Sequence, residues 1–196
     1  GSPIIDRLIV LIILILITWL SCAAQVNNLI DLEKGSFSIK YNSTLGIPSR
    51  VEWFVHDYDL GLAKRQPSFR FAKDKACPKP RVTSRMYSNS GYQRGHMCPA
   101  ADRSASVSLM KQTFVMSNIC PMTPHINAGA WKRTEVYERM VAKKYGSCRC
   151  IASPLFFPKD TTWLAHGRVA VPHAFIKVLT CSDERNFYRI FIVENL

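Results

Sequence analysis

Segments of alternating apolar and polar residues lie at both ends of this 196-residue chain, and one helical segment lies between them. The alternation is that of half-buried strands, and it covers residues 36–59, 149–157, 169–181 and 187–195. Residues 113–120, rich in β-branched and apolar side chains, predict a further strand, and residues 182–186 a turn. Residues 129–144 have helical spacing and stop before Gly146. Strands, then a helix, then strands predict an α+β fold.

An uncharged apolar run, residues 8–20, precedes these segments. It is too short to span a bilayer comfortably, Arg7 stands before it, and small residues follow it at 21–24, which is the layout of a secretory signal. We therefore expect a secreted or periplasmic protein, without a stable membrane span after the signal is cleaved. A lipoprotein that is anchored through Cys22 is the alternative.

The leader divides the chain into residues 1–24, a cloning scar followed by the signal peptide, and residues 25–196, which have the length of a single domain. The sequence carries 26 Lys and Arg against 14 Asp and Glu, a formal net charge of +12. Such an excess supports solubility, but it also attracts polyanions. Basic residues crowd residues 63–85, where prolines disfavour regular structure, and this predicts a surface that faces phosphate.

Six cysteines follow the leader: Cys77, Cys98, Cys120, Cys148, Cys150 and Cys181. An even number behind an export signal predicts a framework of disulfide bonds. A zinc site is the alternative. However, the sequence has no C-x-x-C, and the C-x-C pair at residues 148–150 has no second pair to complete four ligands.

The stretch YQRGHMCPAAD, residues 92–102, places Arg94 two residues before His96. On an extended strand both side chains project from the same face. A histidine taken alone is usually a structural or surface residue. An arginine beside it supplies a fixed positive charge for a phosphate and keeps the imidazole neutral, as a general base requires. We therefore interpret His96 as a base.

A second pattern lies downstream, where Asn127, Trp131, Glu135 and Arg139 are each four residues apart. On a helix such residues form one stripe. A surface ion pair between Glu135 and Arg139, with Trp131 as a core anchor, is the ordinary explanation. The place of Asn127 at the helix start favours a second explanation, a metal site, because an amide oxygen there can ligate a hard cation while Glu135 holds a metal-bound water.

Together, RGH and the downstream SNICPMTPHINAGAWKRTE resemble the DNA/RNA non-specific endonucleases, which are ββα-metal or His-Me finger nucleases. The resemblance covers roughly residues 53–195 and includes the spacing from Asn118 to Asn127, Glu135 and Arg139. It implies an α+β fold of the ββα-metal type, with an antiparallel sheet core and flanking helices. It also implies magnesium-dependent hydrolysis of DNA and RNA without sequence preference, leaving 5′-phosphate products.

The resemblance implies a role for each matching residue. His96 is the general base, Asn127 is the protein ligand of one Mg²⁺, for which Mn²⁺ or Ca²⁺ could substitute, and Glu135 orders water on that ion. Phosphate contacts are implied for Arg94, for Arg139 and for one upstream arginine, where Arg65 is the candidate and Arg70 the rival. Asn118 is implied to help arrange the site.

One departure from the family's signature is Gln93, where the signature has Asp, so a negative charge is missing beside the base. An alternative function is therefore a catalytically weakened nucleic-acid-binding protein on the same fold. A disulfide-stabilised module that binds acidic polysaccharide would explain the charge and the cysteines, but it leaves the helical stripe without a role.

The resemblance further implies a disulfide bond between Cys98 and Cys120. Cys98 lies two residues after His96 and Cys120 two residues after Asn118, on strands that the family pairs in antiparallel fashion. Opposite Cα atoms in such a pair lie about 4.5 to 5.5 Å apart, which a disulfide tolerates. Buried free thiols are the alternative. The pair at 148 and 150 should not bridge internally, which leaves Cys77 and Cys181 as partners in either order.

Overall fold

The computed structural model describes residues 28–157, 159–181 and 187–196. Its centre is an antiparallel sheet of six strands in the order β1-β2-β3-β6-β9-β10. These strands are β1 (Leu29–Glu33), β2 (Phe37–Asn42), β3 (Ile47–His56), β6 (Ser147–Leu155), β9 (Ala174–Cys181) and β10 (Phe187–Glu194). Two smaller pairs are β4 (Gln93–His96) with β5 (Ile119–Met122), and β7 (Trp163–Leu164) with β8 (Val169–Ala170).

The α-helices of the described chain are α2 (Val107–Gln112), α3 (Pro124–Ala128) and α4 (Ala130–Tyr145). The short 3-10 helices are η1 (Asp57–Asp59), η2 (Ser84–Tyr87), η3 (Ala100–Arg103) and η4 (Met116–Asn118). Within the described ranges, no helix has the length and apolar character needed to cross a membrane.

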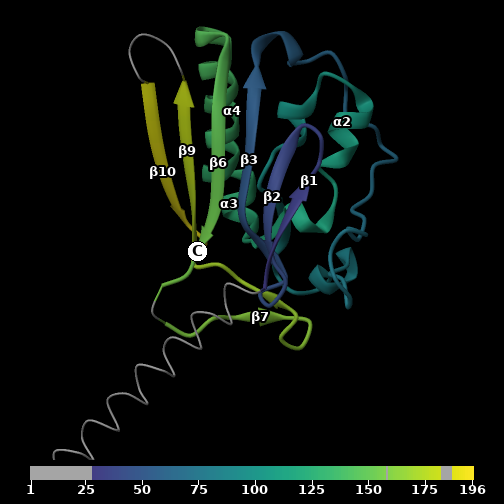
Figure 1. Ribbon diagram of the computed structural model, residues 1–196. Coiled ribbons are helices and arrows are strands. Elements are labelled where there is room, and N and C mark those ends of the chain that lie inside the picture. Colours follow the sequence, from purple (N-terminus) through teal and green to yellow (C-terminus); the bar gives the residue numbers. More distant parts are fainter. Residues whose placement is uncertain (1–27, 158, 182–186) are drawn as a thin grey trace, which may run out of the picture.

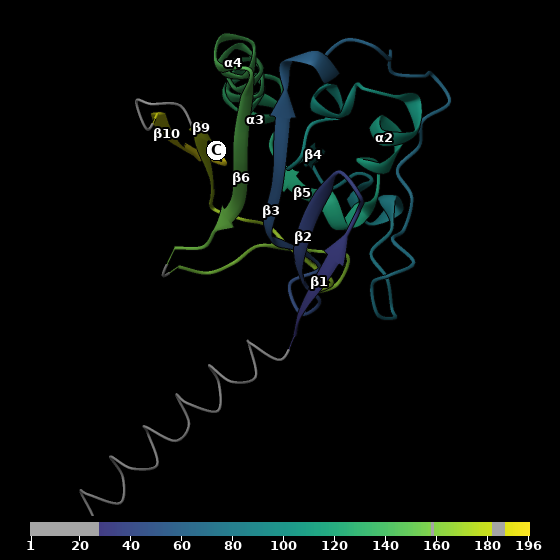
Figure 2. The same cartoon turned by 45° about the horizontal axis from the view of Figure 1, so that its top comes forward.

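Helix α4 covers one face of the six-stranded sheet (Figure 1), and the β4–β5 pair lies on the same side (Figure 2). Side chains alternate along β3 accordingly, so that Trp53 and Val55 are buried while 48% of Phe54 is exposed. The main core therefore lies between the inner face of the sheet and the layer formed by α4, β4 and β5. This α+β arrangement is the predicted fold.

Helix α4 confirms the helix predicted for residues 129–144. Its inner face buries residues at helical spacing: Trp131, Thr134, Glu138, Val141 and Ala142. The helix ends at Gly146, whose φ of 82° suits glycine. Asn127 does not begin this helix, because it lies in the separate helix α3. Gly129 joins the two helices, and a Cβ there would collide with the carbonyl oxygen of His125.

The strands predicted at 149–157 and 187–195 are confirmed as β6 and β10. Residues 36–59 form two strands, β2 and β3, because the chain turns back at Gly46, which has a φ of 67°. Residues 169–181 also divide, into β8 and β9, at Pro172, whose ring removes a backbone donor from the ladder.

The strand predicted at 113–120 was largely wrong. Thr113 caps α2, and the backbone N–H of Asn118 bonds to the carbonyl of Val115 in the turn η4, so only Ile119 and Cys120 reach the strand β5. Strand β1 was missed because it is an edge strand that buries only Leu32. The predicted leader and the turn at 182–186 lie outside the described residues.

The six cysteines that follow the leader are free and buried, so the predicted disulfide framework is not formed in this structure. The bond between Cys98 and Cys120 was the wrong pairing. In the β4–β5 register Gly95 lies opposite Cys120, three residues away from Cys98. An odd offset along a strand turns two side chains to opposite faces. Because β4 and β5 run in opposite directions, a step of two residues forward on each strand moves the two positions away from each other. The equal offsets of Cys98 and Cys120 therefore do not bring these residues together.

A different pair of cysteines comes together at one end of the sheet. The register of β6 and β9 pairs Arg149 with Thr180, so the next position sets Cys148 opposite Cys181. Interactions with the thiols of Cys150 and Cys181 lower the pKa of the Cys148 thiol. The Sγ atom of Cys150 lies 3.9 Å from that of Cys148 on the same face of β6.

We expect thiol–disulfide exchange with oxidised glutathione to join Cys148 to Cys181. Directly opposite residues of an antiparallel pair have Cα atoms about 4.5 to 5.5 Å apart, within the range of a disulfide. Peptide mapping of the unreduced protein measures the bond, and a Cys98→Ser variant should give the same yield. A linked peptide that contains Cys98 and Cys120, without one that joins Cys148 and Cys181, would contradict the expectation.

Candidate active site

A cavity of about 650 Å³ opens between α4 and the segment that follows β3. Its lining includes His96 from β4 and Arg65 from residues 63–85, which we call the basic loop. It also includes Glu135 and Arg139 from α4. Residues that were predicted from separate segments of the sequence therefore meet at one place. The other predicted site residues, Arg94, Asn118 and Asn127, do not line this cavity.

Two contacts hold the backbone of His96 in place. The preceding Gly95 lies so close to the side chain of Met122 on β5 that a Cβ atom would collide with it, which explains the glycine of the RGH motif. The indole Nε1 of Trp131 donates a hydrogen bond of 2.9 Å to the backbone carbonyl of His96. This bond ties α4 directly to the strand that carries the predicted base.

The imidazole of His96 is packed between aromatic rings. The centroids of Phe71 and Phe114 lie 5.3 and 4.8 Å from it. Its Nε2 atom is buried and has no hydrogen-bond partner among the described residues. Burial, and secondly the charge of Arg65, lowers the pKa of His96 from 6.5 to about 3. The imidazole is therefore neutral at pH 7, and an anionic phosphate in the cavity would raise this pKa again.

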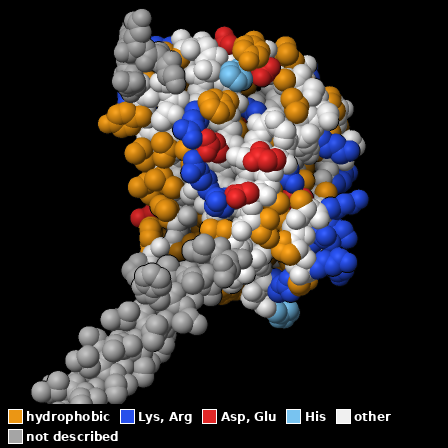
Figure 3. Space-filling view, in the orientation of Figure 1, with side chains coloured by type: hydrophobic (Ala, Val, Ile, Leu, Met, Phe, Trp, Pro, Cys, Tyr) orange, Lys and Arg blue, Asp and Glu red, His pale blue; other side chains and the backbone are white. Residues whose placement is uncertain are grey.

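Aromatic residues anchor the basic loop beside the imidazole. Phe69 is buried and packs edge to face on Phe114, with 5.3 Å between the ring centroids. The Arg65 guanidinium lies over Phe114 at 4.8 Å and lines the cavity, whereas Arg70 donates to carbonyls of its own loop. The structure thus places Arg65, rather than Arg70, beside His96. Lys and Arg side chains gather along the edge where this loop runs (Figure 3).

Arg94 shares a strand face with His96, as predicted, since its guanidinium lies 5.9 Å from the Phe71 ring that also contacts the imidazole. It donates to the carbonyl of Ser84 in η2 at 2.6 Å, which holds it outside the cavity. Asn118 is fully buried, and its amide exchanges two 2.9 Å hydrogen bonds with the backbone of Cys98. These bonds secure the chain just after His96, which is a positioning role.

Asn127 offers an oxygen ligand for a metal ion. Its Nδ2 donates a 2.7 Å hydrogen bond to Oε1 of Gln93, and its Oδ1 has no hydrogen-bond donor among the described residues. Amide oxygens are ligands that Mg²⁺ accepts, so the geometry fits the implied metal role. Gln93, the departure from the signature, is the neighbour that orients this amide. Glu135 is half-buried on α4, and burial raises its pKa to about 7.

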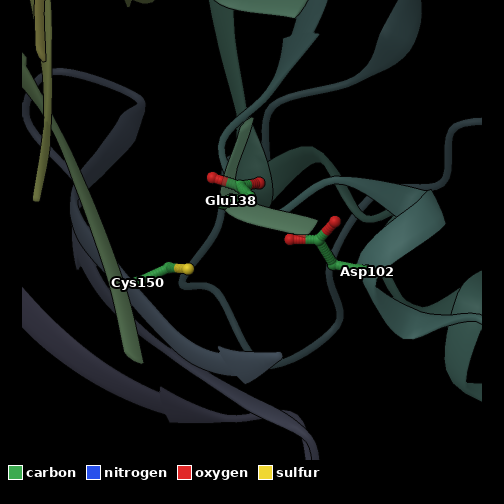
Figure 4. Close-up of side chains that lie close together, drawn as sticks. All are labelled: Asp102, Glu138 and Cys150. Atoms are coloured by element: carbon green, nitrogen blue, oxygen red, sulfur yellow. The ribbon is translucent and has the colours of Figure 1, made fainter. Parts of the chain in front are cut away.

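A second cluster, which the sequence did not predict, lies behind the cavity. Figure 4 shows Asp102, Glu138 and Cys150, all buried, with one ligand atom of each within 4.8 Å of the others. By distance alone these groups could hold an ion. However, the ammonium of Lys177 lies 2.7 Å from Glu138, at ion-pair distance although off the line of a hydrogen bond. Arg139 donates to Asp102 at 2.8 Å.

Two cations therefore already balance the two carboxylates, and they would repel a divalent ion. We interpret the cluster as a buried charge network that supports the site. Asp102 also accepts a 2.8 Å hydrogen bond from the indole of Trp53, and the Lys177 ammonium lies 4.4 Å from the Trp131 ring. The network thus holds Arg139 at the cavity wall and packs beneath the tryptophan that binds the His96 carbonyl.

The sequence did carry a signal for this network. Glu138 lies on the apolar face of α4, between Thr134 and Val141, and Lys177 takes an inward position on β9 between Phe175 and Leu179. A charged residue at a core position predicts a buried partner of opposite charge.

Replacing Lys177 by Met is expected to lower the free energy of unfolding by about 3 to 5 kcal/mol, because the buried Glu138 loses its counter-charge. Urea denaturation measures the loss. Lys40→Met is the matched control, since its 3.1 Å pair with Asp31 is exposed and should contribute less than about 1 kcal/mol. Equal losses in the two variants would refute the network.

The antiparallel β4–β5 pair with the following helix defines a ββα-metal nuclease fold, and a neutral histidine lies in the adjacent cavity together with Arg65 and Arg139. The chain belongs to the DNA/RNA non-specific endonuclease family, whose sequence profile matches residues 22–195.

Three nucleases show how similar this chain is to individual proteins. The chain is 34% identical over 153 residues to a nuclease of Nostoc sp., covering 76% of this chain and 54% of the relative. It is 33% identical over 178 residues to nuclease C1 of Cunninghamella echinulata var. echinulata, covering 84% and 71%. It is 34% identical over 125 residues to mitochondrial endonuclease G of Homo sapiens, covering 59% and 42%.

The chain spans about half the length of the first of these relatives. Among solved structures, a crystal structure of the EndoG/EndoGI complex matches with a TM-score of 0.78 over 85% of this chain and 74% of that chain. Its sequence identity is 21%, so this likeness concerns the fold.

Proposed function

We propose that this chain is an exported, magnesium-dependent endonuclease that hydrolyses phosphodiester bonds of DNA and RNA without sequence preference. The observation that supports it best is the imidazole of His96, which lines the same cavity as Arg65, Glu135 and Arg139 and is held neutral because burial lowers its pKa. A proton acceptor beside cationic groups is the arrangement that hydrolysis of a phosphate ester requires.

In the proposed reaction, the neutral imidazole of His96 accepts a proton from water in the cavity, and the hydroxide that forms attacks phosphorus in line. Arg65 and Arg139 bind the phosphate oxygens and balance their charge. The 3′ oxygen leaves, so the phosphate remains on the 5′ end of the product. Asn127 would hold Mg²⁺ and Glu135 a water on it; the bound ion supplies stabilisation of negative charge on the phosphate and the leaving oxygen.

Cleavage without sequence preference follows if the protein contacts phosphate and sugar, because these contacts carry no base information. The basic loop at residues 63–85 supports such contacts, since its phenylalanines pack inward while Lys64, Arg65 and Arg70 are exposed.

Export rests on the apolar leader at residues 8–20. N-terminal sequencing of the protein recovered from the medium or the periplasm should begin close to residue 25. Recovery of only the uncleaved chain from inside the cells would contradict export. Some relatives are named mitochondrial nucleases.

His96→Ala should lower the rate of plasmid cleavage by about 10²- to 10⁴-fold, the usual contribution of a general base. Nucleic-acid binding should persist because the basic surface is intact. Gel assays with magnesium or EDTA measure cleavage, and fluorescence anisotropy measures binding. His173→Ala, remote from the cavity, is the control. If the His96 variant cuts at the rate of the control, His96 is structural and the mechanism fails.

Asn127→Ala should sharply raise the magnesium concentration that half-saturates cleavage, because the ion loses its direct protein ligand. Gln93→Ala should raise it less, since Gln93 orients Asn127 without binding the ion. Glu135→Ala should mainly lower the rate at saturating magnesium, by about 10- to 100-fold. Magnesium titrations of the initial rate separate these effects. Titrations identical to the parent's would remove all three assignments.

A further inference from the structure

The cavity that contains His96 has an apolar half for which the proposed reaction has no use. Its charged lining consists of Lys64, Arg65, Glu135, Arg139 and Lys143. The remaining wall is largely apolar and is formed by Leu60, Ala63, Pro99, Ala100, Met110, Val136 and Met140. Phosphate chemistry accounts for the first group only.

Helix geometry sets the two kinds of wall side by side. Glu135, Arg139 and Lys143 are four residues apart on α4, and Val136 and Met140 follow the first two by one residue. Two parallel stripes, one charged and one apolar, therefore face the cavity. The apolar stripe is open to solvent, with 45% of Val136 and 60% of Met140 exposed. Exposed apolar residues that share a cavity with cationic ones suit a ligand with both characters.

The chemistry of the lining identifies that ligand. Four cations and one carboxylate line the charged half, so the ligand is an anion, and the adjacent wall requires an apolar surface joined to it. A nucleotide has both parts, because its phosphate is linked to a sugar and a flat base. A cavity of about 650 Å³ falls within the range of about 300 to 1,000 Å³ that small-molecule sites occupy.

We infer that the apolar wall of Leu60, Val136 and Met140 binds the nucleoside next to the scissile phosphate, with its base unstacked. This inference rests on the proposed function and deepens it. In a duplex, base stacking and pairing oppose such binding, and opening costs free energy. Single-stranded or locally opened nucleic acid is therefore the preferred substrate class, and intact duplex is cut more slowly.

The experiment uses a labelled single strand of DNA with one central abasic residue, and the same strand without it. The products are separated on a sequencing gel. Because cleavage occurs at many phosphates, the intensity of each product band is normalised to that of bands from distant phosphates in the same lane. We expect cleavage at a phosphate that flanks the abasic residue to fall at least about five-fold, since the contact of the apolar wall with the base is lost while the sugar and phosphate remain. The parent protein should also cut the intact strand faster than its duplex.

The double variant Val136→Ser, Met140→Ser should reduce this selectivity, so that abasic and intact strands are cut alike at that position. Both residues are exposed, and urea denaturation checks that the variant is folded. Val107→Ser on α2 is the matched control, since Val107 is 44% exposed but does not line the cavity. It should keep the parent's selectivity.

Equal cleavage of the abasic and intact positions by the parent protein would overturn the inference while leaving the proposed function standing. Retention of the full five-fold difference by the double variant would overturn it as well. If the parent protein cuts neither strand, nor plasmid, with magnesium present, the proposed function fails and the inference fails with it.

Discussion

The hydrogen bond from the Trp131 indole to the carbonyl of His96 is the contact on which the site depends. It fixes α4 against β4, and so it sets the helical residues Glu135 and Arg139 relative to His96. Trp131 is itself fully buried, with the Lys177 ammonium 4.4 Å from its ring. A site assembled from a strand and a helix far apart in sequence needs such a rigid junction, because small displacements of reacting groups cost large factors in rate.

Burial has two opposite uses around this junction. The imidazole of His96 is packed between aromatic rings, and this burial keeps it neutral at the cavity that it lines. Asp102 and Glu138 are equally buried, but each faces a cation. An uncharged imidazole therefore lies at the cavity, while the charges behind the cavity are compensated.

Gln93 differs from the family's signature but still contacts Asn127. The residue lacks the negative charge of the family's Asp, yet its amide oxygen accepts the hydrogen bond that orients Asn127. Orientation requires an acceptor at the right distance, and a neutral amide provides one. What the substitution removes is charge, and with it the electrostatic attraction for a cation at this position.

The sequence by itself determined the α+β class, helix α4 and the candidate residues His96, Asn127 and Glu135, because periodicity and motif spacing are local properties of the chain. It also contained the inward positions of Glu138 and Lys177 without showing that they meet. Only the tertiary structure decided the strand register, which separates Cys98 from Cys120, and the choice of Arg65 over Arg70 as the arginine beside His96. Register and loop path depend on which surfaces pack together, and contacts between distant segments leave no regular spacing in the sequence.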